Sequence, residues 1–249
     1  MGLFDFLKGG NKAEKELTWE EENTYTGETP DCPNCGTPLT KRYVFSVSEL
    51  MIHQLRLDGI YTSRNSSYIT VNIVLVSTER GVDNVLNVLQ EHQPARKNVI
   101  VKITPELSVP NGPGIDSILE FQPDSKPYSE LKEFLKLYKE NVEIHGMICF
   151  DFNDFFTLIR GRNVISTVSY EYREDITEAL SQLKPAKIQD GDKYLLYFTI
   201  DKFDNKEMPN RLVPINDFME TFPDKNIMYW NFRELSPQIV TLFTSTPIE

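Results

Sequence analysis

The sequence predicts an α/β fold: a mostly parallel or mixed sheet covered by helices, preceded by a short segment resembling a zinc knuckle. From residue 43 onward, β-branched apolar runs alternate with segments whose apolar residues follow helical spacing. Two cysteines separated by two residues, Cys32 and Cys35, stand before this alternation. The 249 residues are 40% hydrophobic and 25% charged, a composition typical of globular proteins.

The net charge and the hydropathy of the chain exclude some classes of partner. The net charge is −11 and no local basic patch is evident in the sequence, so no nucleic-acid partner is expected. No apolar stretch reaches the roughly 20 residues that a transmembrane helix needs, and the first residues lack the pattern of a signal peptide. These features predict a cytoplasmic protein without a transmembrane segment.

Residues 1–30 are expected to form a flexible acidic N-terminal segment. Its first residues place four apolar side chains on a short amphipathic turn that ends at Gly9 and Gly10: Leu3, Phe4, Phe6 and Leu7. This pattern favours a terminus that docks on the protein itself, and a weak membrane or partner anchor is the alternative.

Residues 31–42 contain the pair Cys32 and Cys35, which flanks a Pro-Asn turn and resembles half of a zinc ribbon. A structural zinc ion needs four ligands, and the second cysteine pair of a ribbon is missing. The ligands that could complete the site are His53, His92, His145 or the same cysteine pair from a second chain. A degenerate ribbon without metal and a redox-active pair remain as alternatives.

Residues 43–110 form the first predicted α/β half. A capping-box spacing from Ser46 to Glu49 predicts the start of a helix. The following pattern indicates, in order, a strand at 68–77, a helix at 81–92 and a strand at 98–103. Residues 104–116 are rich in proline and glycine and predict a loop at the boundary between the halves. No sequence in the chain matches a phosphate-binding glycine loop.

Residues 115–249 form the second predicted α/β half. Strands are expected at 116–121, 144–151, 163–172, 193–201, 226–232 and 238–245, and helices at 128–141, 152–161, 173–183 and 213–222. The last two strands are expected to form an antiparallel hairpin across residues 233–237. Tyr229, Trp230 and Phe232 would belong to the core on a central strand, and to a partner surface on an edge strand.

The octapeptide CFDFNDFF places Asp151 and Asp154 three residues apart, immediately before a predicted helix. Acids at this position accept hydrogen bonds from free backbone amides and interact with the positive end of the helix dipole. A role as helix caps is therefore the first interpretation. Metal binding with His145 is an alternative, although no third ligand is evident on the same side.

Residues 143–246 resemble the C-terminal domain of the FtsZ/tubulin family, in which a strand leads into an N-x-D-F-x-D-V loop and a helix. Asp151 and Asp154 align with the two loop acids, with Phe152 between them and Phe155 in place of the valine. In that family, the loop acids of one subunit polarise water on the GTP of its neighbour. The resemblance thus implies contact with a GTPase in trans. Cys149 replaces the loop asparagine, and the glycine-rich phosphate signature is absent.

The sequence therefore predicts a non-catalytic protein-interaction or assembly module. Its partner would be another protein, such as a filament-forming GTPase, or a second copy of the chain. The alternatives are a nucleotide or phosphate hydrolase that uses Asp151 and Asp154 as catalytic residues, and a bacterial regulatory or immunity-type binding protein. The only cofactor expected is zinc at Cys32 and Cys35.

Overall fold

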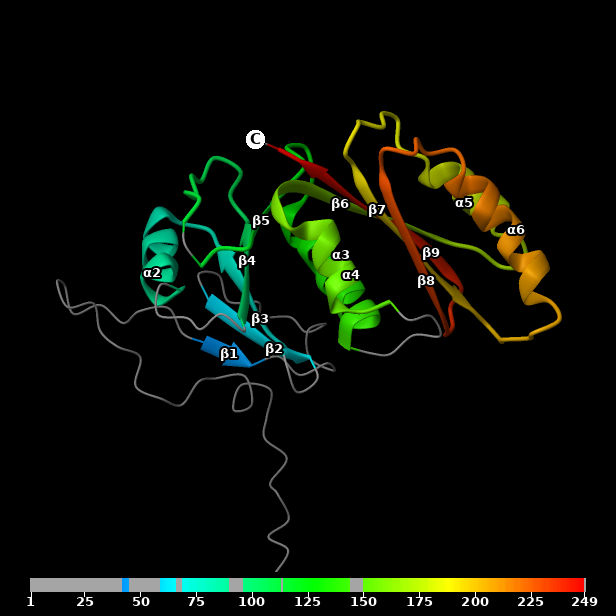
Figure 1. The fold of residues 1–249 in the computed structure, drawn as a ribbon, viewed down its shortest axis with the longest axis horizontal. Coiled ribbons are helices and arrows are strands. Elements are labelled where there is room, and N and C mark those ends of the chain that lie inside the picture. The colour runs from blue at the N-terminus through cyan, green and yellow to red at the C-terminus, as the bar shows by residue number, and fades with distance from the viewer. Residues whose placement is uncertain are drawn as a thin grey trace, which may run out of the picture.

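The described residues form a nine-stranded mixed sheet with the strand order β1-β2-β3-β4-β5-β6-β9-β7-β8 (Figure 1). The computed structural model describes residues 42–44, 59–65, 69–89, 96–112, 114–143 and 150–248. Helices cover both faces of this sheet, so the predicted α/β class with a mixed sheet is confirmed. The predicted helix from Ser46 lies outside the described residues, and so do residues 144–149 of the strand predicted at 144–151. The last two residues of that strand, Phe150 and Asp151, are described and do not form a strand.

In the first part of the sheet, β3, β4 and β5 are parallel, and β6 of the second part continues them in the same direction. Strands β3, β4, β5 and β6 run parallel to one another, and β2 pairs antiparallel with β3. The elements are β1 (Arg42–Val44), β2 (Gly59–Asn65), β3 (Ile69–Val76), α2 (Glu79–Leu89), β4 (Arg96–Lys102), β5 (Ser117–Phe121), α3 (Pro127–Tyr138) and the π-helical turn η3 (Lys139–Glu143).

The second part begins with α4 and ends with the last two strands. Each strand except the last follows a helix, as the alternating periodicity predicts. The elements are α4 (Phe152–Ile159), β6 (Gly161–Glu171), α5 (Thr177–Leu183), β7 (Lys193–Ile200), α6 (Met208–Met219), β8 (Ile227–Glu234) and β9 (Ile239–Pro247).

The predicted hairpin between the last two strands is wrong. Strand β8 pairs parallel with β7, whereas β9 lies between β6 and β7 and is antiparallel to both. Five of the six residues from Val240 to Ser245 are buried, so this strand requires covered faces and neighbours on both sides. The hydroxyl of Thr199 on β7 receives the N–H of Ile239 at 2.8 Å, which ties the crossing segment to the end of β7.

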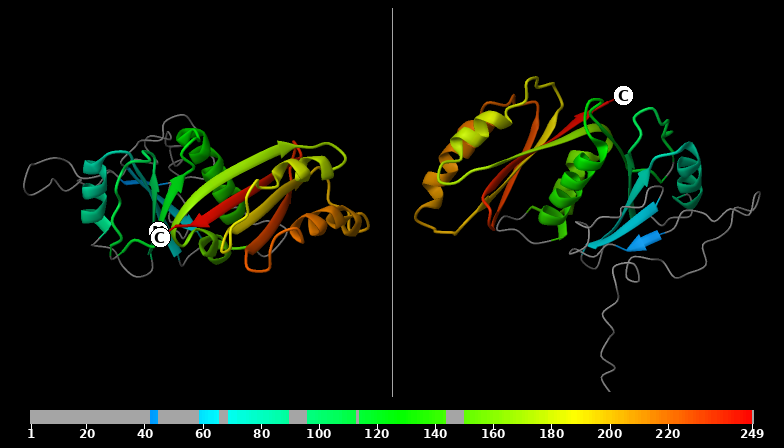
Figure 2. Two further views of the ribbon diagram at one scale, coloured as in Figure 1. Left: turned by 90° about the horizontal axis from the view of Figure 1, so that it is seen from above. Right: turned by 180° about the vertical axis from the view of Figure 1, so that it is seen from behind.

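Alternate residues of the strands pack against different helices. One face of the sheet packs on α3 and α4, which cover its middle. The opposite face packs on α2 at the β3–β5 end and on α5 and α6 at the β7–β8 end. The further views show α5 and α6 beside each other on this second end (Figure 2). Strand β8 therefore packs against helices or the aromatic core on both of its faces, whereas its outer edge has no neighbouring strand among the described residues.

Candidate interaction surface

The outer edge of β8 carries unpaired main-chain groups. The N–H of Ile227 donates to the carbonyl of Asp192 at 3.2 Å, and the N–H of Leu235 donates to that of Ile200 at 2.9 Å. Odd-numbered residues of β8 thus direct their main chain toward β7, because alternate residues of a strand point their N–H and C=O groups in opposite directions. Residues Met228, Trp230 and Phe232 direct theirs outward, where no described strand pairs with them.

The side chains of β8 make a partly exposed aromatic surface beside this edge. The Trp230 ring packs beside the rings of Phe198 and Phe232, with centroid distances of 6.2 and 6.1 Å, and these two rings stack on each other at 5.4 Å. On the other face, Tyr229 meets Phe150 edge to face at 5.7 Å. Trp230 and Tyr229 are only half-buried, and Ile227 at the strand start is 38% exposed. Strand β8 is an edge strand in the described structure, where Tyr229 and Trp230 are partly exposed and Phe232 is buried, and partner binding by these residues stays a prediction.

Strand β8 has few of the features that normally protect a sheet edge. Natural edges are kept from pairing by lysine, proline, bulges or short length. Strand β8 has eight residues and contains neither lysine nor proline. Its two charged side chains are engaged, since Arg233 pairs with Glu140 and Glu234 accepts the N–H of Phe203 at 3.2 Å. One outward donor is blocked, because Asn231 Oδ1 accepts the N–H of Phe232 at 2.9 Å.

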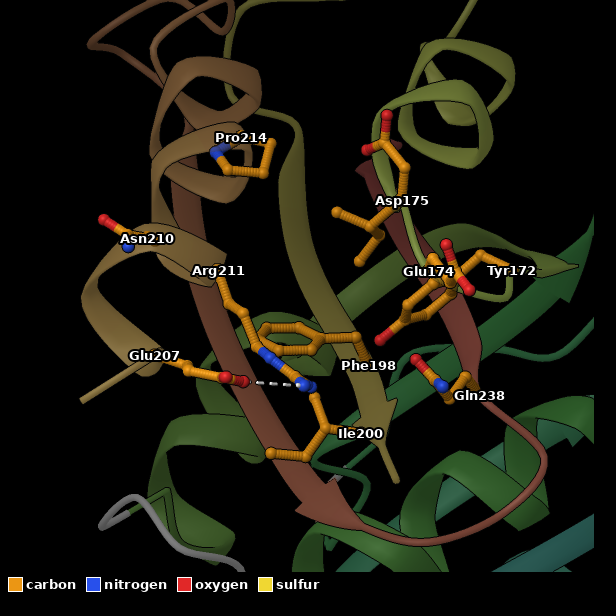
Figure 3. A pocket seen from close by; sticks show the side chains of 11 residues that line it. Tyr172, Glu174, Asp175, Phe198, Ile200, Glu207, Asn210, Arg211, Pro214 and Gln238 are labelled. Carbon is orange, nitrogen blue, oxygen red and sulfur yellow. Dashed lines mark hydrogen bonds and ion pairs between the residues drawn. The ribbon is translucent and has the colours of Figure 1, made fainter. Parts of the chain in front are cut away.

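A groove of about 420 Å³ lies on the α5–α6 side of β7 (Figure 3). Phe198 and Ile200 of β7 form its floor, and Arg211 of α6 forms one wall with Glu207, the residue that precedes this helix. The opposite wall comes from the segment between β6 and α5: Tyr172, Glu174, Asp175 and Ile176. A second hollow between α5 and α6 shares Asp175, Asn210 and Pro214 with it, so the two are continuous.

Carboxylates dominate the charges of this groove. Arg211 is already held by Asp201 at 3.2 Å and by Glu207 at 3.3 Å. The hydrogen bond to Asp201 raises the pKa of Arg211, and the same contact lowers the pKa of Asp201. Burial raises the pKa of Tyr172 to about 12, so this phenol stays protonated and donates to the carbonyl of Thr199 at 2.5 Å. The remaining acids therefore set the sign of the groove's field.

Asp151 and Asp154 lie at the N-terminus of α4 and form a capping box. Asp151 Oδ1 accepts the N–H groups of Asn153 at 2.7 Å and of Asp154 at 3.1 Å, and Asp154 Oδ2 accepts the N–H of Asp151 at 3.1 Å. Each carboxylate thus satisfies a main-chain donor that the first helical turn leaves free. The structure brings these two predicted residues together, and their catalytic role stays a prediction.

Replacing Asp151 by alanine is expected to lower the free energy of unfolding by about 0.5–2 kcal/mol, because two amides of α4 lose their acceptor. Chemical denaturation of both proteins measures the difference. Asn153→Ala, on the same exposed turn, is the matched control and is expected to change stability by less than about 0.5 kcal/mol. Equal stability of Asp151→Ala and the native chain would contradict the capping role.

The predicted zinc site lies outside the described residues. This applies to Cys32 and Cys35, and also to the ligands considered for completing the site, His53, His92 and His145, and to Cys149. Among the residues that the structure describes, no three His, Cys, Asp or Glu side chains gather as a metal-binding group. The described helices include none long and apolar enough to cross a bilayer.

Sequence reasoning did not find the groove between α5 and α6. Its walls come from segments far apart in the chain, which meet only after β7 takes its place beside β9. The one local signal was the density of acids around residues 171–178 and 201–207.

Comparison with known proteins gives weak structural matches. A mutant FtsZ from M. jannaschii matches with 14% identity and a TM-score of 0.36, covering 71% of this chain and 56% of the FtsZ chain. CetZ2 from Haloferax volcanii, in a GTPγS-bound protofilament, matches with 12% identity and a TM-score of 0.44 over 72% and 65%. TubZ from Bacillus thuringiensis serovar israelensis, in a GTPγS-form protofilament, matches with 8% identity and a TM-score of 0.43 over 71% and 60%.

The chain thus spans 56% to 65% of the length of these three proteins. No protein-family model and no curated protein matches the sequence. Likeness of this size does not establish a family, so a function has to be inferred from the chain's own geometry.

Proposed function

We propose that the chain is a non-catalytic protein-interaction module that binds an extended segment of another protein along β8. The observation that carries this proposal is the regular, eight-residue edge whose outward main-chain groups have no described partner strand. An added strand would satisfy these groups, while the half-buried rings beside them would supply the apolar contact that gives specificity.

A different protein suits this edge better than a second copy of the chain. With a net charge of −11, two copies repel each other, and Glu234, whose carboxylate accepts a main-chain N–H rather than a cation, adds a negative charge at this edge in each copy. The resemblance of residues 143–246 to the FtsZ/tubulin C-terminal domain makes a filament-forming GTPase the first partner to test. Pairing of β8 with itself is an outcome that the same experiment detects.

Replacing Met228 by proline is expected to weaken partner binding about tenfold or more while leaving the fold intact. The N–H of Met228 points away from β7, so proline removes no bond of the β7–β8 ladder. It removes an outward donor and places a ring where the added strand would lie. Met228→Ala shortens the same side chain and keeps the N–H, and is therefore the matched control.

Both variants are used as full-length bait in a lysate of the native host, with circular dichroism confirming the fold. The expected result is a partner retained by the native chain and Met228→Ala, and weakened about tenfold or more by Met228→Pro. Amide exchange at Met228 and Trp230 should slow when the captured partner is added. Equal capture by both variants would overturn the β8 proposal, and a dimer lost only in Met228→Pro would replace it by self-association.

The hydrolase alternative depends on Asp151 and Asp154, whose carboxylates already serve the first turn of α4. It predicts that the purified chain hydrolyses GTP and that Asp151→Asn with Asp154→Asn removes the activity. Turnover by the chain alone, lost in that variant, would refute the non-catalytic proposal.

A further inference from the structure

We propose that the groove between α5 and α6 binds the first fifteen residues of this chain, through the apolar residues Leu3, Phe4, Phe6 and Leu7 and the lysines that follow them. This site is separate from the outer edge of β8, and the two proposals fail independently.

The groove calls for a cationic ligand with an apolar anchor. Its described lining contains four acids, Glu174, Asp175, Glu207 and Asp217, and one base, Arg211. Arg211 is committed to Asp201 and Glu207, whereas Glu174 and Asp217 have no cationic partner among the described residues. Val213 lines the second hollow and is 52% exposed, beside the half-buried ring of Pro214. An apolar side chain placed here would cover Val213 while flanking cations meet the free carboxylates.

The first fifteen residues have this composition, and the following ones do not. Their charged side chains are three lysines, Lys8, Lys12 and Lys15, and two acids, Asp5 and Glu14. Residues 16–31 contain six acids and no lysine or arginine. In the part of the chain before β1, four closely spaced apolar side chains followed by three lysines therefore occur at one place only, and the acidic stretch behind it would be repelled by the groove.

The chain is long enough for this segment to reach the groove. Residues 16–41 separate the segment from β1, and a fully extended chain of that length spans at most about 90 Å. Strands β1 and β8 mark the two ends of the sheet, which eight interstrand spacings separate by about 38 Å. Binding within one chain is therefore allowed by length, and a tethered segment acts at an effective concentration of roughly 1 mM.

The test uses a fluorescent peptide of residues 1–15 and the full-length chain, with binding followed by anisotropy. In the native chain the peptide has to displace the tethered segment, so it should bind weakly. Phe4→Ser with Phe6→Ser removes the anchors of the tethered segment and should improve peptide affinity about tenfold or more. Adding Glu174→Lys and Asp217→Lys to this variant should abolish that binding, and a peptide with Lys8→Glu and Lys12→Glu should restore it.

The control variant carries the same charge change elsewhere. Glu106→Lys with Asp124→Lys replaces two exposed acids in the connections before β5 and after it, outside the groove lining, and should leave peptide affinity unchanged. Equal binding to the groove variant and this control would overturn the proposal. A second result would also overturn it. If the Phe4→Ser, Phe6→Ser variant binds an unrelated leucine–lysine peptide and does not bind the peptide of residues 1–15, the groove would be a site for another protein. Sedimentation velocity distinguishes binding within one chain from exchange between two chains.

Discussion

Phe155→Ala is expected to lower the free energy of unfolding by about 3–5 kcal/mol, the cost of emptying a buried aromatic position. The Phe155 side chain is completely buried, and its ring meets those of Tyr138 at 5.5 Å and Phe243 at 6.0 Å. The rings of Phe134 and Phe150 also contact Phe155, at centroid distances of 6.1 and 6.5 Å. Alanine would leave a cavity, and its neighbours on α3, on β9 and on the segment before α4 are held in separate places and cannot close it together.

Urea denaturation of the native and variant chains measures this loss. Phe156→Ala is the matched control, because Phe156 follows directly in the same helix and is only partly buried, against Phe152 and the Lys97 ammonium. Its replacement should cost no more than about 1.5 kcal/mol, mostly in lost stacking. Similar losses for both variants would show that α4 does not anchor the central core through Phe155.

The order of helices and strands could be predicted from local patterns because the apolar period changes from strand to helix within each unit. In the helix predicted at 128–141, for example, the apolar residues at helical spacing are all buried on the inner side of α3: Leu131, Phe134, Leu135 and Tyr138. The capping role of Asp151 was likewise readable, since it requires only an acid before a helix.

The partners of each strand could not be read in the same way. Short connections favour hairpins, so the spacing between the last two strands suggested one. The burial of both faces of β9 overrides that preference and moves this strand between β6 and β7, leaving β8 at the edge. The candidate surface on β8 exists because β9, and not β8, occupies the central position between β6 and β7. Trp230 becomes half-exposed and the α5–α6 groove forms only once the long-range pairing is set.

Removing the carboxylate of Glu120 is expected to destabilise the chain nearly as much as emptying the aromatic core, by about 3–5 kcal/mol for Glu120→Ala. Glu120 lies between two cations, at 2.9 Å from Lys102 Nζ and 3.0 Å from an Arg162 nitrogen. Lys102 is only 6% exposed, so water cannot replace the lost carboxylate, and its charge would stay buried without a counterion. The stability of Glu120→Gln should lie between those of the native chain and Glu120→Ala, because glutamine keeps the shape of the side chain and loses its charge.

The exposed pair of Lys225 and Asp190 provides the comparison that isolates burial as the cause. Its atoms are closer, at 2.7 Å, yet both side chains are more than two-thirds exposed. Water screens such a pair, so Asp190→Ala should cost less than about 1 kcal/mol. If distance alone decided the strength of an ion pair, Asp190→Ala would be the more harmful replacement. Urea denaturation at low salt is the appropriate measurement, because guanidinium chloride would screen the charges and mask the difference. Equal losses of stability in Glu120→Ala and Asp190→Ala would contradict a stabilising role for the buried ion pairs of Glu120.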